Sequence, residues 1–501
     1  MKNGDDLHKL IHSLSKAEKR YFKMQAVQHT KKEQNNYVLL FDAIERQSVY
    51  NEDKLCRKLS RYAFSKNLSK TKYLLFELIL RTMQQLHLGR TVRSEIAALL
   101  ESIELLYRKT NYEQTYNLII KAKKLALKNE LYPQLLSISN WERRVHPYLR
   151  KEIQTARTLI EQYRELSRKV DVEHQYTLLF EEMQQWYDNG LYLQTSDDSF
   201  NRFKELASHQ LLSKLPEDAS FLSSIYYYRT RALIAVAENN FSKALTSLNT
   251  IKKLWERHVH LINIFKEEYV HSLTSYFIYS MNAKRKEVDY ASLLDSLRVL
   301  KSSTKQEAIR TSFLICTLDF MHSLTFENRS MCKLKFLEVK DWLEAHPGML
   351  SNSWMATVQY YICIFHFLTQ DYVEALEVTE QLKKVPQINN YPHILSYCKL
   401  IGLMACFEEK RYDELEIEIR KTYRHLKKRQ QIGAIEKTIL TYTRKLLNAQ
   451  DTEINGIFSE FHVSLCELES SNFPWHIVGG TNAISRWVKE KLPKNSNKII
   501  N

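Results

Sequence analysis

The chain contains little glycine and little proline. Its 501 residues include 9 Gly and 8 Pro, about 3% of the chain where average usage is about 12%. Sheet-rich folds need frequent tight turns and glycine-rich loops. The scarcity therefore predicts an all-α protein with long helices joined by short polar turns. Because this length exceeds the size at which a single core stops growing, we expect several domains or a repeat array.

Long apolar runs and paired cysteines are also lacking. The longest apolar run, YYICIFHFL at residues 360–368, is too short to span a bilayer. The opening MKNGDDLHKL has no apolar segment of the kind found in secretory signals. The seven cysteines are scattered without a CxxC pair, which is typical of reduced, buried thiols. We expect a cytoplasmic protein without membrane contact, disulfide framework or zinc site.

Linear signatures of catalysis are absent as well. The sequence contains no GxxxxGK[ST], GxGxxG, HExxH or GxSxG motif. We therefore expect that the chain is not an enzyme, and no catalytic residue, cofactor or metal ligand is assigned.

What the chain does have is a recurring turn. Four segments place a polar residue and an aromatic residue directly before an amphipathic helix, as in NYEQTYNLII and NNFSKALTSL. The aromatic residues are Tyr112, Phe241, Tyr372 and Tyr412. Weaker turns centred near 153, 197, 290 and 331 complete a spacing of about 40–49 residues. We interpret each repeat as two antiparallel helices that stack on their neighbours. Asn111, Asn240 and Asp371 are the expected N-caps of the second helices.

This pattern resembles tetratricopeptide repeats (TPR) and their longer relatives over about residues 92–430. Ala244 and Ala375 match the family's small residue after the turn aromatic, whereas Thr115 and Leu415 depart from it. The period exceeds the family's 34 residues and its Trp-x-x-Leu-Gly opening is missing. The resemblance implies an α-solenoid with a groove for a protein segment, but it names no ligand.

Three regions follow from these patterns. We expect a basic helical bundle over residues 1–90, TPR-like repeats over 91–430, and capping helices with a frayed tail over 431–501. The leading functional hypothesis is a protein–protein interaction scaffold that binds a partner segment in the concave face of the array. Tyr227, Arg229 and Arg231 are its candidate partner-binding residues, since aromatic and arginine side chains dominate binding surfaces. The oligomeric state is left open.

The alternative hypothesis is a nucleic-acid-binding regulator. Residues 1–90 carry 18 Lys and Arg against 9 Asp and Glu, a net charge of +9 out of +15 for the whole chain. Such a surplus favours anionic partners. The segment at 51–83 predicts a short helix, a turn, and a longer helix at 69–88 capped by Ser69, in the layout of a helix-turn-helix. The candidate contacts are Lys16, Lys19, Arg20, Lys70, Lys72 and Tyr73.

The first ninety residues also fit a simple cap for the array, because the ends of repeat arrays need a polar outer face. Helices are predicted at 7–28, 36–47, 51–60 and 69–88. In the first, Leu7, Ile11, Leu14, Tyr21 and Met24 recur at helical spacing and predict one buried stripe, together with Leu10, Ala17 and Val27. The lysines of that helix then form a solvated back.

Overall fold

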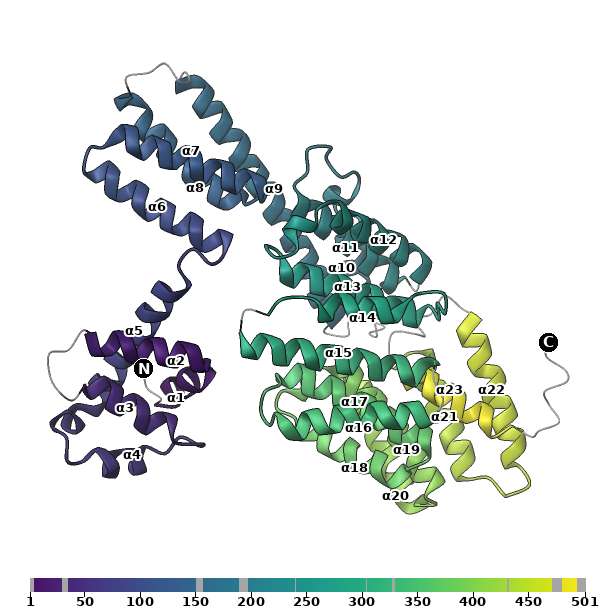
Figure 1. Cartoon of the computed structure of the whole chain (residues 1–501). Helices are drawn as coiled ribbons and strands as arrows, with labels where there is room; N and C mark the ends of the chain where they lie inside the picture. Colours follow the sequence, from purple (N-terminus) through teal and green to yellow (C-terminus); the bar gives the residue numbers. More distant parts are fainter. Residues whose placement is uncertain are drawn as a thin grey trace. The chain divides into compact units, whose positions relative to one another are not determined.

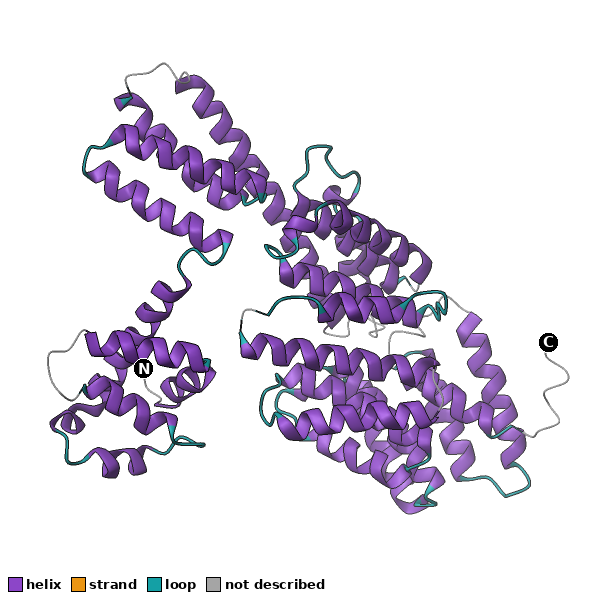
Figure 2. Ribbon diagram, in the orientation of Figure 1, coloured by secondary structure: helices purple, strands orange, loops and turns teal. Residues whose placement is uncertain are grey.

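The computed structural model describes most of the chain. The described residues are 4–28, 35–149, 156–188, 197–238, 240–302, 304–326, 329–429, 432–470 and 480–492. Every regular element among them is a helix (Figures 1 and 2), which confirms the all-α prediction. None of these helices combines the length and the apolarity needed to cross a bilayer. The predicted turns centred near 153 and 197 lie at or beside residues outside the described ranges.

The chain divides into two compact units. Unit 1 comprises residues 1–168 and 300–311, and unit 2 comprises residues 169–299 and 312–501. Of the three divisions, one falls inside α9 (Ala156–Asp188), one inside α15 (Lys305–Phe326), and one between residues 299 and 300, before α15. The domain boundaries expected at residues 90 and 430 stay predictions.

Unit 1 begins with five helices that share one hydrophobic core. They are α1 (Gly4–Ser13), α2 (Lys16–Gln28), α3 (Asn36–Glu45), α4 (Glu52–Leu59) and α5 (Leu68–His87), with a 3₁₀ turn at Ala63–Asn67. Leu7, Phe22, Phe41, Leu75 and Ile79 are among the buried residues of this core. The helices predicted near 36, 51 and 69 are therefore present. Ser69, however, lies inside the first turn of α5 and does not cap it, so that predicted cap is wrong.

The helix predicted over residues 7–28 is two helices, and the cause is a capping box. The Ser15 backbone N–H donates to Glu18 Oε2 (2.7 Å), and the Glu18 N–H donates to Ser15 Oγ (3.2 Å). This reciprocal pair starts α2 with a new rotational phase. Phe22 is consequently buried, whereas Ala17, Met24 and Val27, which were predicted to be buried, are exposed. The predicted stripe is correct for α1 and wrong for these three residues of α2.

The remaining helices follow in sequence, with short 3₁₀ turns between some of them. In unit 1 they are α6 (Val92–Arg108), α7 (Tyr112–Lys128), α8 (Tyr132–Val145), the 3₁₀ turn His146–Tyr148 and the first part of α9. In unit 2 they are α10 (Asp197–Ala207), α11 (Phe221–Ala237), α12 (Phe241–Arg257), α13 (Lys266–Asn282), α14 (Tyr290–Arg298), α16 (Arg329–Ala345), α17 (Asn352–Thr369), α18 (Tyr372–Lys383), α19 (Pro392–Glu408), α20 (Tyr412–Lys428), α21 (Ala434–Leu447), α22 (Ile454–Ser470) and α23 (Gly480–Glu490), with 3₁₀ turns at Gln210–Leu212, Val259–Leu261 and Ile388–Asn390. Most helices pack against the next one along the chain.

The four turn aromatics each occupy the first position of a helix, namely of α7, α12, α18 and α20. The fourth position of each helix (Thr115, Ala244, Ala375 and Leu415) is fully buried, so the turns share one geometry despite different residues there. In three of them the turn aromatic meets another aromatic five residues earlier at an edge-to-face angle. These pairs are Tyr107–Tyr112, Phe367–Tyr372 and Phe407–Tyr412.

In three of these turns a residue other than glycine adopts the left-handed conformation. Thr110, Gln370 and Lys410 have φ of 58°, 70° and 55°. The N–H of the following residue then bonds to the carbonyl five residues before it, as in Asn111 N–H to Leu106 O (3.0 Å). This is the Schellman geometry, in which glycine is usual. Glu130 (φ 50°) forms the same turn before Tyr132, and the sequence pattern did not reveal it.

The expected side-chain N-caps are present at only one of three turns. Asn240 Oδ1 accepts from the Lys243 N–H (2.9 Å), as predicted. Asn111 and Asp371 make no such bond, so the prediction is wrong there. Asp371 instead accepts from the Thr369 hydroxyl (2.7 Å), because its carboxylate faces back towards the preceding helix end.

Candidate functional site

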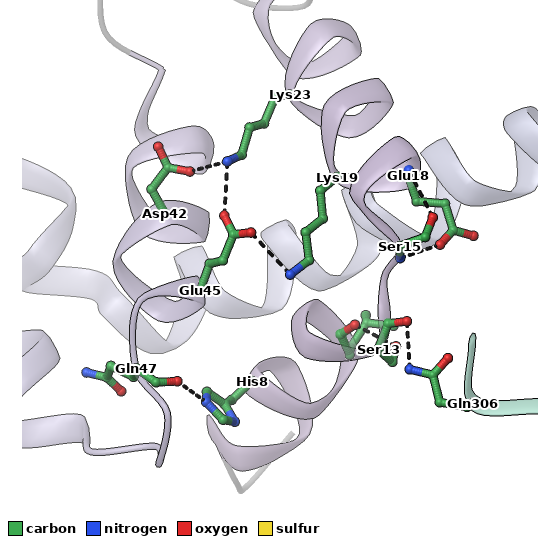
Figure 3. Close-up of polar contacts among 11 residues, drawn as sticks. His8, Ser13, Ser15, Glu18, Lys19, Lys23, Asp42, Glu45, Gln47 and Gln306 are labelled. Atoms are coloured by element: carbon green, nitrogen blue, oxygen red, sulfur yellow. Dashed lines mark hydrogen bonds and ion pairs between the residues drawn. The ribbon is translucent and has the colours of Figure 1, made fainter. Parts of the chain in front are cut away.

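The predicted nucleic-acid contact Lys19 lies in an internal ion-pair network. Lys19 Nζ lies 3.1 Å from Glu45 Oε1, and Lys23 Nζ lies 2.8 Å from Asp42 Oδ1 and 3.0 Å from Glu45 Oε2 (Figure 3). Partial burial raises the pKa of Glu45, but the hydrogen bonds from both lysines outweigh it, so the net pKa is lowered. These cations hold α2 against α3.

Lys72 is also engaged inside the bundle. The residue is 8% exposed, and its Nζ donates to Glu52 Oε1 (2.7 Å) and to the Tyr50 hydroxyl (3.3 Å). Burial lowers the pKa of Lys72, but the bonds to Glu52 and Tyr50 outweigh that effect and the net pKa is raised. Lys72 therefore remains charged and ties α5 to the start of α4.

The other four predicted contacts are exposed and fall into two groups. Lys16 and Arg20 lie near the start of α2, which is next to the end of α5 because His87 Nε2 lies 2.8 Å from Glu18 Oε1. Lys70 and Tyr73 lie near the start of α5, about 25 Å away along the helix at 1.5 Å per residue. The six predicted residues thus do not form one patch. Nucleic-acid binding stays a prediction.

Further exposed cations lie near Lys70 in sequence and were not among the predicted contacts. They are Lys54, Arg57, Lys58, Arg61 and Lys66, on α4 and in the connection to α5. Leu55 and Leu59 on the same helix are buried, so α4 has one apolar face and one basic face. The alternation of basic and apolar residues in DKLCRKLSR could have revealed this surface from the sequence.

The predicted partner-binding residues on α11 have mainly internal contacts. Arg229 is 5% exposed and donates through Nη2 to the Glu268 carbonyl and to Ser272 Oγ (3.3 Å) on α13. Burial lowers the pKa of Arg229 to about 10. Tyr227 is buried and its hydroxyl accepts from Arg231 Nη1 (2.7 Å). Of the three, Arg231 alone has an exposed side chain, and their role in partner binding stays a prediction.

Unit 2 contains a cavity of about 590 Å³, which the sequence did not predict. This volume is within the range of small-molecule sites. Helices α15, α17, α22 and α23 and the loop after α13 surround it. Its apolar wall includes Met321, Leu324, Tyr361, Ile364 and Leu368, which recur at three- and four-residue steps on α15 and α17.

The charged side chains that line this cavity are all basic. Lys284 and Lys286 come from the loop after α13, and Arg486 and Lys489 from one face of α23. No lining residue in the described part of the chain is Asp or Glu. Arg486 Nε lies 3.3 Å from Glu490 Oε1, whereas Lys286 and Lys489 form no ion pair with a described residue. The cavity thus combines an apolar wall with at least two uncompensated cations.

His462 and Cys466 complete the lining on α22. Cys466 is exposed and reduced, and its Sγ lies 3.8 Å from His462 Nδ1. Nearby, Trp487 anchors α23, since its Nε1 donates to Glu408 Oε1 (2.8 Å) on α19. Trp487 is buried, and its ring contacts those of Phe367, Phe407 and Phe458 on α17, α19 and α22.

Within the described ranges, no three His, Cys, Asp or Glu side chains lie close enough together to bind a metal ion. Comparison of the chain with protein-family models, with curated proteins and with solved structures gives no match in any of the three.

Proposed function

We propose that the chain is a protein–protein interaction scaffold, built as a TPR-like α-solenoid of antiparallel helix pairs. The recurring Schellman turns support this architecture, because each one ends a helix and starts the next within three residues. The aromatic pairs Tyr107–Tyr112, Phe367–Tyr372 and Phe407–Tyr412 add a shared feature to three turns. Helical arrays of this kind bind partners through extended surfaces.

The observation that carries the proposal is a second apolar face on α16. Cys332, Phe336 and Val339 pack into the core of unit 2. Met331, Leu334 and Leu337 are 39%, 50% and 43% exposed. At 100° per residue these two sets lie on nearly opposite sides of the helix. Single exposed apolar residues are ordinary, but a row of three with charged neighbours has the composition of an interface centre with a polar rim.

Site-specific crosslinking tests this proposal. With p-benzoylphenylalanine at position 334, irradiation of cells should join the chain to a second protein. The same group at position 253 on α12, which is exposed and polar in the native chain, is the control. Leu337→Asp should reduce the adduct at position 334 by placing a charge in the contact. Identical adducts at both positions, or none at 334, would contradict the proposal.

A second candidate function is nucleic-acid binding through the basic face of α4 and the start of α5. Its support is the exposed set Lys54, Arg57, Lys58, Arg61, Lys66 and Lys70, next to the exposed ring of Tyr73. The full chain should shift a DNA duplex at about 50 mM salt and much less at about 200 mM. Arg57→Ala/Lys70→Ala should weaken binding more than Lys253→Ala/Lys428→Ala, which removes equal charge elsewhere. Equal weakening would indicate a diffuse charge effect only.

A further inference from the structure

We infer that the cavity of unit 2 binds a small anionic amphiphile, a molecule with one carboxylate or phosphate head and an apolar body. This goes beyond the scaffold function and does not rest on it, since no residue of α16 lines the cavity.

The apolar wall of the cavity provides a packing surface for the apolar body of the ligand. Leu324 on α15 and Ile364 and Leu368 on α17 approach the cavity from two helices. Burial of an apolar chain against such a wall contributes about 25 cal/mol per Å² removed from water. A fully polar ligand would leave this surface without a partner.

The basic side chains of the cavity provide contacts for the anionic head group of the ligand. Lys286 and Lys489 come from segments far apart in sequence, yet both line this cavity and neither has an ion-pair partner among the described residues. Arg486 also lines the cavity, where its Nε lies 3.3 Å from Glu490 Oε1. Because no described lining residue is acidic, the positive potential is not cancelled inside the cavity, and an anion gains charge-assisted hydrogen bonds there.

Size and access agree with a small ligand. The volume of about 590 Å³ accommodates a drug-sized molecule and is too small for a packed helix of a partner. Cys466 lines the cavity and is exposed, so reagents in solution can reach the interior. This cysteine is therefore a built-in reporter of occupancy.

The test uses the full chain and follows alkylation of Cys466 by iodoacetamide with mass spectrometry. Cys56 is exposed in unit 1 and serves as the internal reference. Decanoate is the probe, below the concentration at which it forms micelles. At ten times its dissociation constant it should slow alkylation of Cys466 by about tenfold and leave Cys56 unchanged. 1-Decanol, which has the same body and no charge, should protect less.

Two charge-reversed chains provide the matched comparison. Lys286→Glu/Lys489→Glu should abolish protection by decanoate, whereas Lys253→Glu/Lys428→Glu, at exposed positions outside the cavity, should retain it. Calorimetric titration of decanoate into the Cys466→Ser chain measures binding without the thiol. Equal protection by decanol, full protection in Lys286→Glu/Lys489→Glu, or no heat of binding would overturn the inference. Protection only by an acidic, leucine-containing peptide would also overturn it, in favour of a peptide site.

Discussion

Lys72 Nζ lies 2.7 Å from Glu52 Oε1 and links α5 to the first residue of α4. The lysine is buried and the glutamate is half exposed. Glu52→Gln should therefore lower the free energy of unfolding by about 1 kcal/mol, because it leaves a buried charge without its counterion. Lys72→Met should lower the free energy of unfolding by a smaller amount, since the remaining Glu52 carboxylate is hydrated. Urea denaturation at pH 7 compares the two, and a larger loss for Lys72→Met would contradict the expectation.

The capping box at Ser15 and Glu18 should give a measurable pH dependence. Partial burial raises the pKa of Glu18, but bonds from Ser15 and His87 outweigh it, so the net pKa is lowered. The resulting stabilisation is present above the unfolded pKa of about 4.3 and is lost as pH falls through the folded value. Glu18→Gln still caps the helix but does not titrate.

We therefore expect Glu18→Gln to lose less thermal stability than the native chain between about pH 5 and pH 3. Circular dichroism melts at several pH values within this range provide the measurement. Glu101→Gln, at an exposed position on α6, is the control and should follow the native profile. Parallel profiles for Glu18→Gln and the native chain would show that titration of Glu18 does not contribute to the pH dependence of stability.

Thr110 has a left-handed conformation that disfavours a β-branched residue. Thr110→Gly should raise the free energy of unfolding by about 1 kcal/mol, because glycine adopts this φ without steric strain. Ser102→Gly, in the middle of α6, should lower the free energy of unfolding, since glycine destabilises a helix interior. Denaturation curves of both variants test the turn geometry, and two changes of the same sign would refute it.

The seven cysteines should differ in how rapidly they react with a thiol reagent, because their exposure differs. Cys56 and Cys466 are exposed, Cys316 is half-buried, and Cys332, Cys363, Cys398 and Cys406 are buried. Burial raises the pKa of Cys316 and of Cys406 to about 11, so both are mostly protonated at pH 8. Dithionitrobenzoate should thus modify two thiols rapidly in the native chain and all seven in guanidinium. More than two rapid thiols would contradict the packing.

The sequence predicted the helices well because their signals are local. The scarcity of glycine and proline argues for long helices, and Tyr112, Phe241, Tyr372 and Tyr412 were correctly placed at helix starts. A capping box is local too, and SKAE at residues 15–18 was readable as one. One helical phase continued through this segment predicts that Met24 is buried, whereas Met24 is exposed and Phe22 is buried, since each new helix start resets the phase.

The candidate sites could not be predicted in the same way, because they depend on contacts between distant segments. Nothing near Arg229 in sequence shows that Glu268 and Ser272 will enclose it. Likewise, Lys286 and Lys489 line one cavity only after α13 and α23 have packed in unit 2. Charge and aromatic content indicated which residues could bind, but not which of them the fold would bury.

The discontinuity of unit 1 affects how the chain folds during synthesis. Gln306 Nε2 donates to the Ser13 carbonyl (2.8 Å) across 293 positions (Figure 3). At roughly 5–20 residues per second, the ribosome needs about 15–60 s to travel from one to the other. During that interval the nascent N-terminal helices lack one of their own contacts. A chain truncated after residue 168 would lack residues 300–311 of unit 1, and with them this contact.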